Sequence, residues 1–282
     1  MVAKLIALLL TAYAGVSGAL FVGQERILFP KREGGSQVMP PKGWQLEAIT
    51  LTAPDGVTLR GHLAKPPGPP APLLLYYGGN AEWVGARAAH VAAWGQRAVL
   101  LMDYRGYGAS DGAPGERGLV ADALLAYDSV TRRADVDGTS VALFGRSLGT
   151  GVAVQVASER PVQALVLVTP YDSVRAVAQA HYPFLPVAPL LRHPFDSLSR
   201  AGELRAPALF LVSEADTVIP PAHAWRLADA WAGPVERVSF PGRGHNDLVQ
   251  EPGYTEAIAR FLARHHRTPV RESGAAADAR TP

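Results

Sequence analysis

The sequence predicts an α/β domain in which helices cover both faces of a mainly parallel β-sheet. From residue 46 onward, short β-rich runs alternate with longer helical patterns, which is the rhythm of parallel strands joined by crossover helices. Most of the β-rich runs are continuously apolar, as strands covered on both faces must be. The 282 residues are 48% hydrophobic and 18% charged, which supplies one large core and argues against disorder or a coiled coil.

Eight β-rich runs make up the expected sheet. The first two flank Asp55-Gly56, a hairpin turn signal, so the sheet is expected to open with an antiparallel pair. Helical patterns separate the later runs, for example at 116–134, where an apolar stripe recurs at helical spacing. The eight runs span residues 46–52, 57–64, 73–77, 98–103, 140–144, 164–169, 208–213 and 235–240.

The segment at about 171–205 departs from this rhythm. It carries four prolines, several aromatic residues and only short helical patterns. We predict that it forms a small cap over the C-terminal edge of the sheet, where ligands bind in open α/β sheets. For its histidines, His181 and His193, we expect surface or capping roles rather than contact with substrate.

The N-terminal segment 1–26 is apolar. Its run from Leu5 to Gly23 contains 19 residues without a charge, just enough for a helix to cross a bilayer. We therefore predict a single-pass membrane anchor. A cleaved signal peptide is the alternative, because Lys4 precedes an apolar stretch that is followed by small residues at 12–19. Basic residues at both ends, Lys4 on one side and Arg26, Lys31 and Arg32 on the other, leave the orientation open.

Composition limits the classes of partner and cofactor. The 27 Lys and Arg residues nearly balance 25 Asp and Glu residues, and without a basic stripe we expect no nucleic-acid partner. The absence of Cys excludes a disulfide framework, a thiolate nucleophile and a Cys-ligated metal. The polar, unpatterned tail at 267–282 is expected to be disordered.

The pattern Gly-x-Ser-x-Gly occurs twice, around Ser110 and around Ser147. This pattern can place a nucleophilic Ser on a sharp strand-to-helix turn. Ser110 is soon followed by Ala113-Pro-Gly115, turn residues that cannot start a helix there. Ser147 directly follows the apolar run at 140–144 and precedes a small-residue helical pattern. The context therefore predicts Ser147 as the nucleophile.

A Ser hydroxyl needs a base, and the base needs an acid that holds it in one tautomer. Among the 8 histidines, His245 is the best candidate, because it lies in a Gly-rich loop after the last β-rich run. Asp172 and Asp216 both follow a strand and lie between Ser147 and His245 in the chain. We prefer Asp216, since its loop contains Pro220, which can start the next helix, whereas Asp172 is expected to cap the helix that begins at Ser173.

A tetrahedral intermediate also requires backbone N–H donors for its oxyanion. One donor is expected from Leu148, the residue after the nucleophile, at the positive end of its helix. The other is expected from the Gly78-Gly79-Asn80 loop after the third β-rich run, with the amide of Asn80 as the candidate.

Six motifs that carry these residues stand in order along 26–266. They are Tyr77-Gly-Gly-Asn-Ala81, Asp103-Tyr-Arg-Gly-Tyr-Gly108, Gly145-Arg-Ser-Leu-Gly149, Pro170-Tyr-Asp-Ser173, Asp216 with Pro220, and Gly244-His-Asn-Asp-Leu248. The set resembles the serine hydrolases of the α/β-hydrolase fold, and within them the Bem46-like or serine aminopeptidase S33-like branch related to the membrane-associated ABHD hydrolases. The departure is Gly78, where many relatives have His. The resemblance implies an α/β-hydrolase domain at 27–266.

These residues predict hydrolysis of an ester, thioester or amide through an acyl-enzyme on Ser147, with no metal or organic cofactor. The expected substrate is a small-molecule or lipid-like acyl compound. Two alternatives remain open. One is a peptidase that acts on free N-terminal residues, which only the family name suggests. The other is a hydrolase-fold binding protein that has lost its activity.

Overall fold

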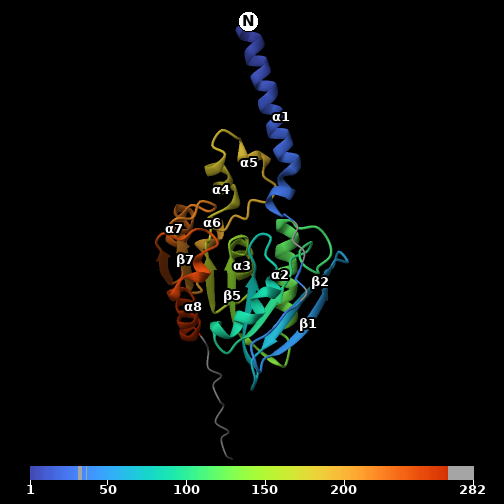
Figure 1. Cartoon of the computed structure of the whole chain (residues 1–282), viewed down its shortest axis with the longest axis vertical. Helices are drawn as coiled ribbons and strands as arrows, with labels where there is room; N and C mark the ends of the chain where they lie inside the picture. The colour runs from blue at the N-terminus through green and yellow to red at the C-terminus, as the bar shows by residue number, and fades with distance from the viewer. Residues whose placement is uncertain (31–33, 36, 266–282) are drawn as a thin grey trace, which may run out of the picture.

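One eight-stranded sheet forms the centre of the molecule, with the strand order β1-β2-β4-β3-β5-β6-β7-β8 (Figure 1). The computed structural model describes residues 1–30, 34–35 and 37–265, so the predicted tail at 267–282 and the basic residues Lys31 and Arg32 lie outside the described part. The strands are β1 (Gln45–Thr52), β2 (Thr58–Lys65), β3 (Ala71–Tyr77), β4 (Ala98–Met102), β5 (Val136–Arg146), β6 (Ala164–Val168), β7 (Ala208–Ser213) and β8 (Val235–Phe240).

The direction of the strands agrees with the prediction. β1 pairs antiparallel with β2, and β2 pairs antiparallel with β4. The remaining neighbours are parallel. The Asp55-Gly56 turn therefore opens an α/β sheet whose parallel strands are connected by helices, as the sequence predicted.

Helices cover both faces of this sheet. Alternate residues of a strand point to opposite faces, and β3 shows the result, since Leu73 and Leu75 join one apolar layer while Leu74 and Tyr76 join the other. The first layer packs against α2, α3 and α7, and the second against η1 and α8. The covering helices are η1 (Val84–Trp94, a 3₁₀ helix), α2 (Glu116–Val130), α3 (Leu148–Glu159), α7 (Pro221–Ala230) and α8 (Pro252–Arg264), with the short 3₁₀ turn η2 (Leu248–Gln250) before α8.

Two element boundaries differ from the prediction by four residues, and the other strand ends differ by at most two. β5 begins at Val136 rather than at 140, because Val136 and Asp137 pair with Ala71 and Pro72 ahead of a register shift. The helix expected at 116–134 ends at Val130. Residues 137–139 and 131–133 are polar, and apolar patterning says little about where a strand or helix ends in such a segment.

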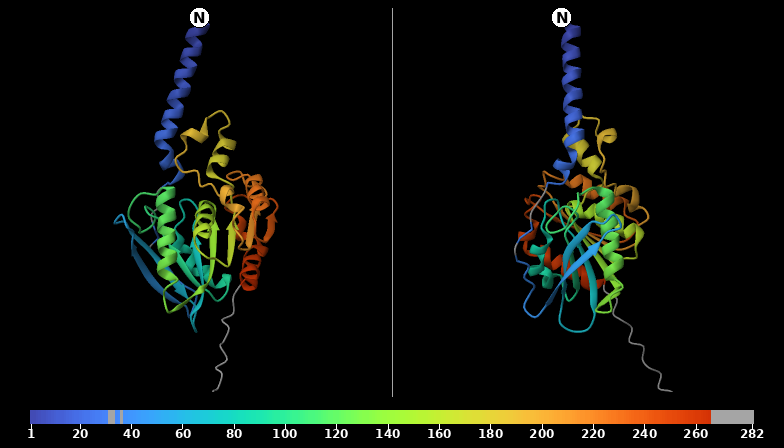
Figure 2. Two further views of the ribbon diagram at one scale, coloured as in Figure 1. Left: turned by 180° about the vertical axis from the view of Figure 1, so that it is seen from behind. Right: turned by 90° about the vertical axis from the view of Figure 1, so that its right-hand side faces the viewer.

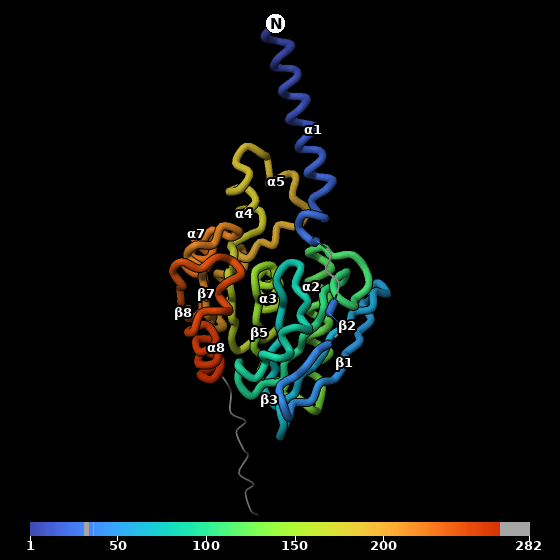
Figure 3. Tube along the Cα trace, viewed as in Figure 1, coloured from blue at the N-terminus to red at the C-terminus, as the bar shows by residue number. Residues whose placement is uncertain are grey.

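The cap lies between β6 and β7 and rises from the C-terminal edge of the parallel strands (Figures 2 and 3). It contains three short helices, α4 (Val174–His181), α5 (Val187–Leu190) and α6 (Leu198–Ala201). In all views the α4–α5 part stands beside the N-terminal helix, away from the sheet.

The N-terminal helix α1 (Val2–Leu28) projects from the same end of the molecule. It continues two residues past the apolar segment predicted at 1–26, and Phe29, directly after it, is buried in the first apolar layer. α1 is long and apolar enough to cross a bilayer, and a signal sequence at the N-terminus would satisfy the same criteria.

Candidate active site

Ser147 occupies a strained turn between β5 and α3. Its φ of 50° and ψ of −118° lie outside the regions that residues with a Cβ prefer. The two glycines of the motif make this turn possible. A Cβ on Gly145 would lie 2.6 Å from the carbonyl oxygen of Gly149, and a Cβ on Gly149 would meet the carbonyl oxygen of Tyr77. The Ser147 N–H donates to the carbonyl of Val168 at 2.9 Å, which ties the turn to β6.

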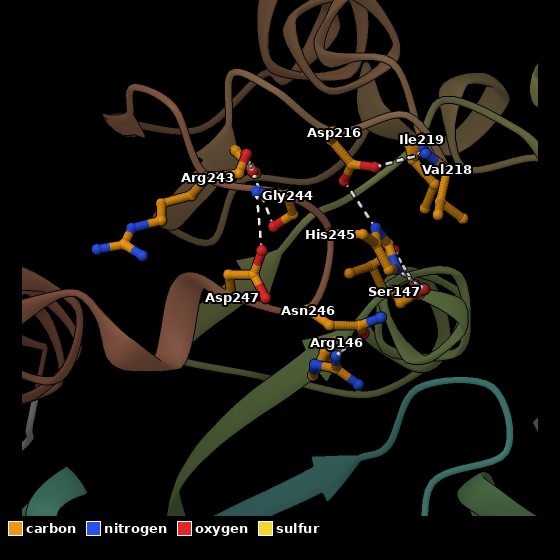
Figure 4. Close-up of polar contacts among 12 residues, drawn as sticks. Arg146, Ser147, Asp216, Val218, Ile219, Arg243, Gly244, His245, Asn246 and Asp247 are labelled. Carbon is orange, nitrogen blue, oxygen red and sulfur yellow. Dashed lines mark hydrogen bonds and ion pairs between the residues drawn. The ribbon is translucent and has the colours of Figure 1, made fainter.

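Ser147, His245 and Asp216 form one hydrogen-bonded series (Figure 4). The distance from Ser147 Oγ to His245 Nε2 is 2.8 Å, and the distance from His245 Nδ1 to Asp216 Oδ2 is 2.6 Å. With the imidazole proton on Nδ1, the ring donates to Asp216 and accepts from the Ser147 hydroxyl. The side chains of His245 and Asp216 are 9% and 2% exposed. The structure thus brings together the three side chains that the sequence predicted as nucleophile, base and acid.

The loops that carry Asp216 and His245 are fastened to each other. Asp216 Oδ1 accepts the N–H groups of Val218 and Ile219, both at 2.8 Å, so the carboxylate is held in one orientation. At the end of β7, the Ser213 hydroxyl reaches the carbonyl of Gly244 at 3.0 Å and that of Arg243. The imidazole and its carboxylate are therefore positioned by one connected unit.

Asp172 corrects a detail of the prediction. The N-cap of α4 is Ser173, whose hydroxyl accepts the N–H of Ala176 at 3.0 Å, and not Asp172. Asp172 is buried and instead contacts His223 Nδ1 at 2.8 Å and Arg226 Nε at 2.8 Å on α7. Burial by itself raises the pKa of this carboxyl, but the hydrogen bonds from His223 and Arg226 outweigh it and lower the pKa. Asp172 joins the cap to α7.

The loop after β3 lies against the nucleophile turn. A Cβ on Gly79 would lie 3.6 Å from the Cβ of Ser147. The Gly79 N–H donates to Glu82 Oε2 at 2.7 Å, so this amide is already engaged. Two tyrosines hold the loop from the other side, because Tyr104 donates to the carbonyl of Gly78 at 3.1 Å and Tyr107 to Asn80 Oδ1 at 2.6 Å.

Leu148 is the first residue of α3, and the first N–H groups of a helix have no acceptor within it. Its amide therefore points out of the helix beside Ser147, at the positive end of the helix dipole. The roles of Leu148 and Asn80 as oxyanion donors remain predictions.

Glu82 is a member of the site that the sequence analysis missed. Its carboxylate accepts from Tyr76 at 2.8 Å, from Arg87 at 2.5 Å and from Arg146 at 3.0 Å, in addition to the Gly79 amide. Burial raises the pKa of this carboxyl, but Arg87 and Arg146 more than offset the effect and hold the pKa below its ordinary value.

Arg146 connects Glu82 to the other side of the site. It immediately precedes Ser147, and its second terminal nitrogen donates to Asn246 Oδ1 at 2.6 Å, one residue after His245 (Figure 4). The loop after β3, the Ser147 turn and the His245 loop are thus linked by the side chains of Glu82 and Arg146. The only signal for this network in the sequence was the charge of Arg146, at the first x position of Gly-x-Ser-x-Gly.

The other candidates have structural partners. Ser110, in the second Gly-x-Ser-x-Gly pattern, donates to the carbonyl of Asp103 at 2.8 Å and accepts the N–H of Arg60 at 2.8 Å. His193 Nδ1 accepts the N–H of Glu116 at the start of α2, and His181 Nε2 lies 2.9 Å from the carbonyl of Val218. Within the described residues, no group of three or more His, Asp or Glu side chains is arranged to hold a metal ion.

Sequence comparisons connect this chain with known hydrolases. Residues 73–199 match the family model described as serine aminopeptidase, S33. The chain is 36% identical over 266 residues to an uncharacterized protein of Mycobacterium tuberculosis, with 91% of this chain and 93% of that protein covered. It is 30% identical to the α/β hydrolase domain-containing protein WAV2 of Arabidopsis thaliana, with coverages of 89% and 91%. It is 29% identical to protein bem46 of Schizosaccharomyces pombe, with 88% of both chains covered.

Solved structures share the fold at lower identity. An acetyl xylan esterase from Paenibacillus sp. R4 superposes with a TM-score of 0.66 and 21% identity, covering 86% of this chain and 99% of that chain. The Pyrococcus furiosus esterase Pf2001 superposes with a TM-score of 0.67 and 18% identity, covering 85% and 100%. At these identities the likeness shows the α/β-hydrolase fold.

Proposed function

The chain belongs to the α/β-hydrolase family of WAV2 and bem46, and we propose that it is a serine hydrolase that cleaves a carboxylic ester through an acyl-enzyme on Ser147. Thioesters and amides present the same reacting carbonyl. The observation that carries the proposal is the hydrogen-bonded series Ser147–His245–Asp216 at a strand-to-helix turn. The two esterases of the same fold support the choice of an ester as substrate.

In the acylation half of the reaction, Ser147 Oγ forms a bond to the carbonyl carbon while its proton passes to His245 Nε2. Asp216 stabilises the resulting imidazolium through Nδ1. The carbonyl oxygen becomes an oxyanion, and the amides of Leu148 and Asn80 are proposed to donate to it. The imidazolium then gives its proton to the leaving alkoxide as the carbon–oxygen bond breaks.

Deacylation repeats these steps with water. His245 removes a proton from the water as its oxygen attacks the acyl carbon, and the proton returns to Ser147 Oγ when the acid product leaves. Proton transfer needs an imidazole held in one orientation. The amides of Val218 and Ile219 hold the Asp216 carboxylate, and the carboxylate in turn holds the His245 ring.

We further propose that α1 anchors the domain in a membrane as a single-pass helix. Its exposed apolar side chains support this, since Leu8, Leu10 and Val16 are 65%, 62% and 56% exposed. Such a surface is unfavourable in water and suited to hydrocarbon. The hydrolase then works beside a bilayer, where a lipid-like acyl compound would reach it at high local concentration.

The bond type is tested with a panel of p-nitrophenyl esters of increasing chain length and a parallel panel of aminoacyl p-nitroanilides. We expect turnover of at least one ester by the purified chain and its loss in Ser147→Ala. Ser158→Ala, an exposed change on the same helix, is the matched control and should retain turnover. Cleavage of the aminoacyl panel alone would instead indicate a peptidase, and a folded protein inert toward both panels would favour a binding protein.

A further inference from the structure

The cap contains a ten-residue segment, Tyr182–Leu191, without a single charged side chain. We call it the apolar cap segment. Six of its ten residues are exposed, with Phe184 at 87% and Tyr182 at 52%, while Val187 is buried. Three of the ten residues are prolines, which present no N–H group. A surface loop of a protein in water rarely combines these properties.

The apolar cap segment runs along α1 (Figures 1 and 2). Gln24 donates to the carbonyl of Leu190 at 3.0 Å and accepts the N–H of Arg192 at 2.8 Å. Farther along the helix, the Tyr13 hydroxyl donates to the carbonyl of Phe184 at 2.8 Å. Side chains of α1 and the cap also line an apolar groove of about 110 Å³ between them.

Three polar side chains of α1 lie on the face of the helix that is turned toward the cap. Tyr13, Ser17 and Gln24 are separated by four and seven positions, so they share one face of the helix. Ser17 and Gln24 are the buried residues of α1. Leu10, Val16 and other apolar side chains remain exposed on the rest of its surface. This is the distribution expected of a helix that faces lipid on one side and protein on the other.

The contacts fix how deep the segment would lie. Tyr13 and Gln24 are eleven positions apart in the helix, or roughly 16 Å at 1.5 Å per residue. The hydrocarbon core of a bilayer is about 30 Å thick, and Tyr13 lies near the middle of the uncharged run from Leu5 to Gly23. If α1 spans a bilayer with this run, Phe184 lies close to the midplane and the rest of the segment, toward Leu190, lies in the leaflet nearer the hydrolase domain.

The backbone of the segment finds partners within the protein. Gln179 on α4 donates to the carbonyls of Tyr182 and Leu185, both at 3.1 Å. The carbonyls of Phe184 and Leu190 accept from α1, as described above. Non-helical backbone at membrane depth requires such internal partners, because hydrocarbon offers none. The loop exposes most of its apolar side chains and pairs these carbonyls with donors of the protein.

Charged groups mark the expected boundary of the bilayer. Arg192 ends the apolar cap segment, lies 4.3 Å from the centroid of the Phe21 ring and pairs with Glu25 at 3.2 Å. Glu25 and Arg26 end the apolar run of α1. Both apolar segments therefore stop at the same level, where an arginine and a carboxylate can reach the headgroups.

We propose that the apolar cap segment inserts into the near leaflet beside α1, so that the protein meets the membrane with two segments. This inference rests on the proposed anchoring by α1. Its position has a consequence for the site, because His181 at the base of the segment contacts the carbonyl of Val218, whose N–H is bonded to Asp216. The membrane-facing part of the cap is thus joined directly to the loop of the candidate acid.

Site-specific fluorescence tests the proposal in the full chain. The sequence has no Cys, so one introduced Cys can carry an environment-sensitive nitrobenzoxadiazole label. Phe184→Cys and Tyr182→Cys report on the cap, Val16→Cys on the lipid-facing side of α1, and Ser158→Cys at the far end of α3 is the aqueous control. Each labelled protein is reconstituted in phosphatidylcholine vesicles and exposed to doxyl-labelled lipid or to aqueous iodide.

We expect the labels at 184, 182 and 16 to lose most of their fluorescence to doxyl lipid and little to iodide, and the label at 158 to show the reverse. If both cap labels behave like the label at 158 while the label at 16 stays lipid-exposed, cap insertion is overturned and the anchor stands. If the label at 16 is also quenched only by iodide, both proposals fail. Two cap positions guard against a local effect of either substitution.

Discussion

Two buried aspartates, Asp216 and Asp172, each contact a histidine, but only the histidine of Asp216 reaches a serine hydroxyl. Asp216→Asn should preserve the fold and favour the wrong imidazole tautomer, lowering kcat by up to about 10⁴-fold. Asp172→Asn leaves Arg226 and the buried His223 without their carboxylate, which should lower the free energy of unfolding by about 3 kcal/mol and leave kcat within about tenfold. Thermal melts and ester kinetics on both variants show which aspartate orients the catalytic histidine. An inactive but stable Asp172→Asn beside an active Asp216→Asn would make Asp172 the acid.

Glu82 is predicted to act on catalysis through position rather than contact. Glu82→Gln keeps an acceptor for the Gly79 amide but removes the negative charge that neutralises Arg87 and Arg146. The loop after β3 should then no longer be held at a fixed position against the Ser147 turn. We expect kcat to fall by about tenfold or more, with a smaller change in KM. Glu47→Gln is the control, because Glu47 also pairs with two cations, Lys65 and Arg133, far from the site. Equal losses in both variants would mean that Glu82 contributes only stability.

Asp103 gives the fold a pH dependence. Burial raises the pKa of its carboxyl to about 6, above the ordinary value of about 3.9. The protonated carboxyl therefore contributes its full share to the free energy of unfolding below about pH 4. This contribution, about 3 kcal/mol, is lost as the pH rises through about 6. Asp103→Asn should unfold at higher denaturant concentration than the parent at pH 8, with the difference shrinking toward pH 4. The exposed Asp111→Asn is the control, and a difference that does not vary with pH would refute the assignment.

At the residue scale, local context in the sequence predicted the three side chains that the structure brings together, Ser147, His245 and Asp216, because each follows a strand in a loop of recognisable composition. It did not identify Glu82 and Asn246, since their contacts with Arg146 join residues that are far apart in the chain. The role given to Asp172 was wrong for the same reason. The cap of α4 is Ser173, and the partners of Asp172 on α7 are distant in the chain and give no local signal.

At the element scale, the apolar runs predicted the strands well and their polar ends poorly. Residues 137–139 are polar, yet β5 extends through them because Val136 and Asp137 pair with Ala71 and Pro72. The cap was predicted from the loss of periodicity in 171–205. Its position against α1 could not be predicted, since it depends on hydrogen bonds between Gln24 and Tyr13 and single backbone groups of the cap.

The N-terminal helix carries its own prediction. If α1 remains attached and spans a bilayer, the intact chain should stay with membranes after alkaline carbonate extraction, and its N-terminus should begin at Met1 or Val2. Sedimentation and N-terminal sequencing measure both. A soluble product that begins after Ala14 or Ala19 would identify α1 as a signal peptide.

At the scale of the whole molecule, one edge of the sheet gathers the functional features. The C-terminal ends of the parallel strands carry Ser147 and Asp216, and the cap and α1 rise from the same end (Figure 1). Parallel topology explains the gathering, because loops after parallel strands all leave at one edge. The opposite edge carries the polar turn regions that connect helices back to strands.

If Ser147 is the nucleophile, a fluorophosphonate probe should modify this residue and no other serine. The serine oxygen displaces fluoride from phosphorus and leaves a stable adduct that peptide mass spectrometry can locate. We predict one adduct, on the peptide that contains Ser147, absent from Ser147→Ala and retained in Ser110→Ala. An adduct on Ser110, or a folded protein that forms none, would contradict the account.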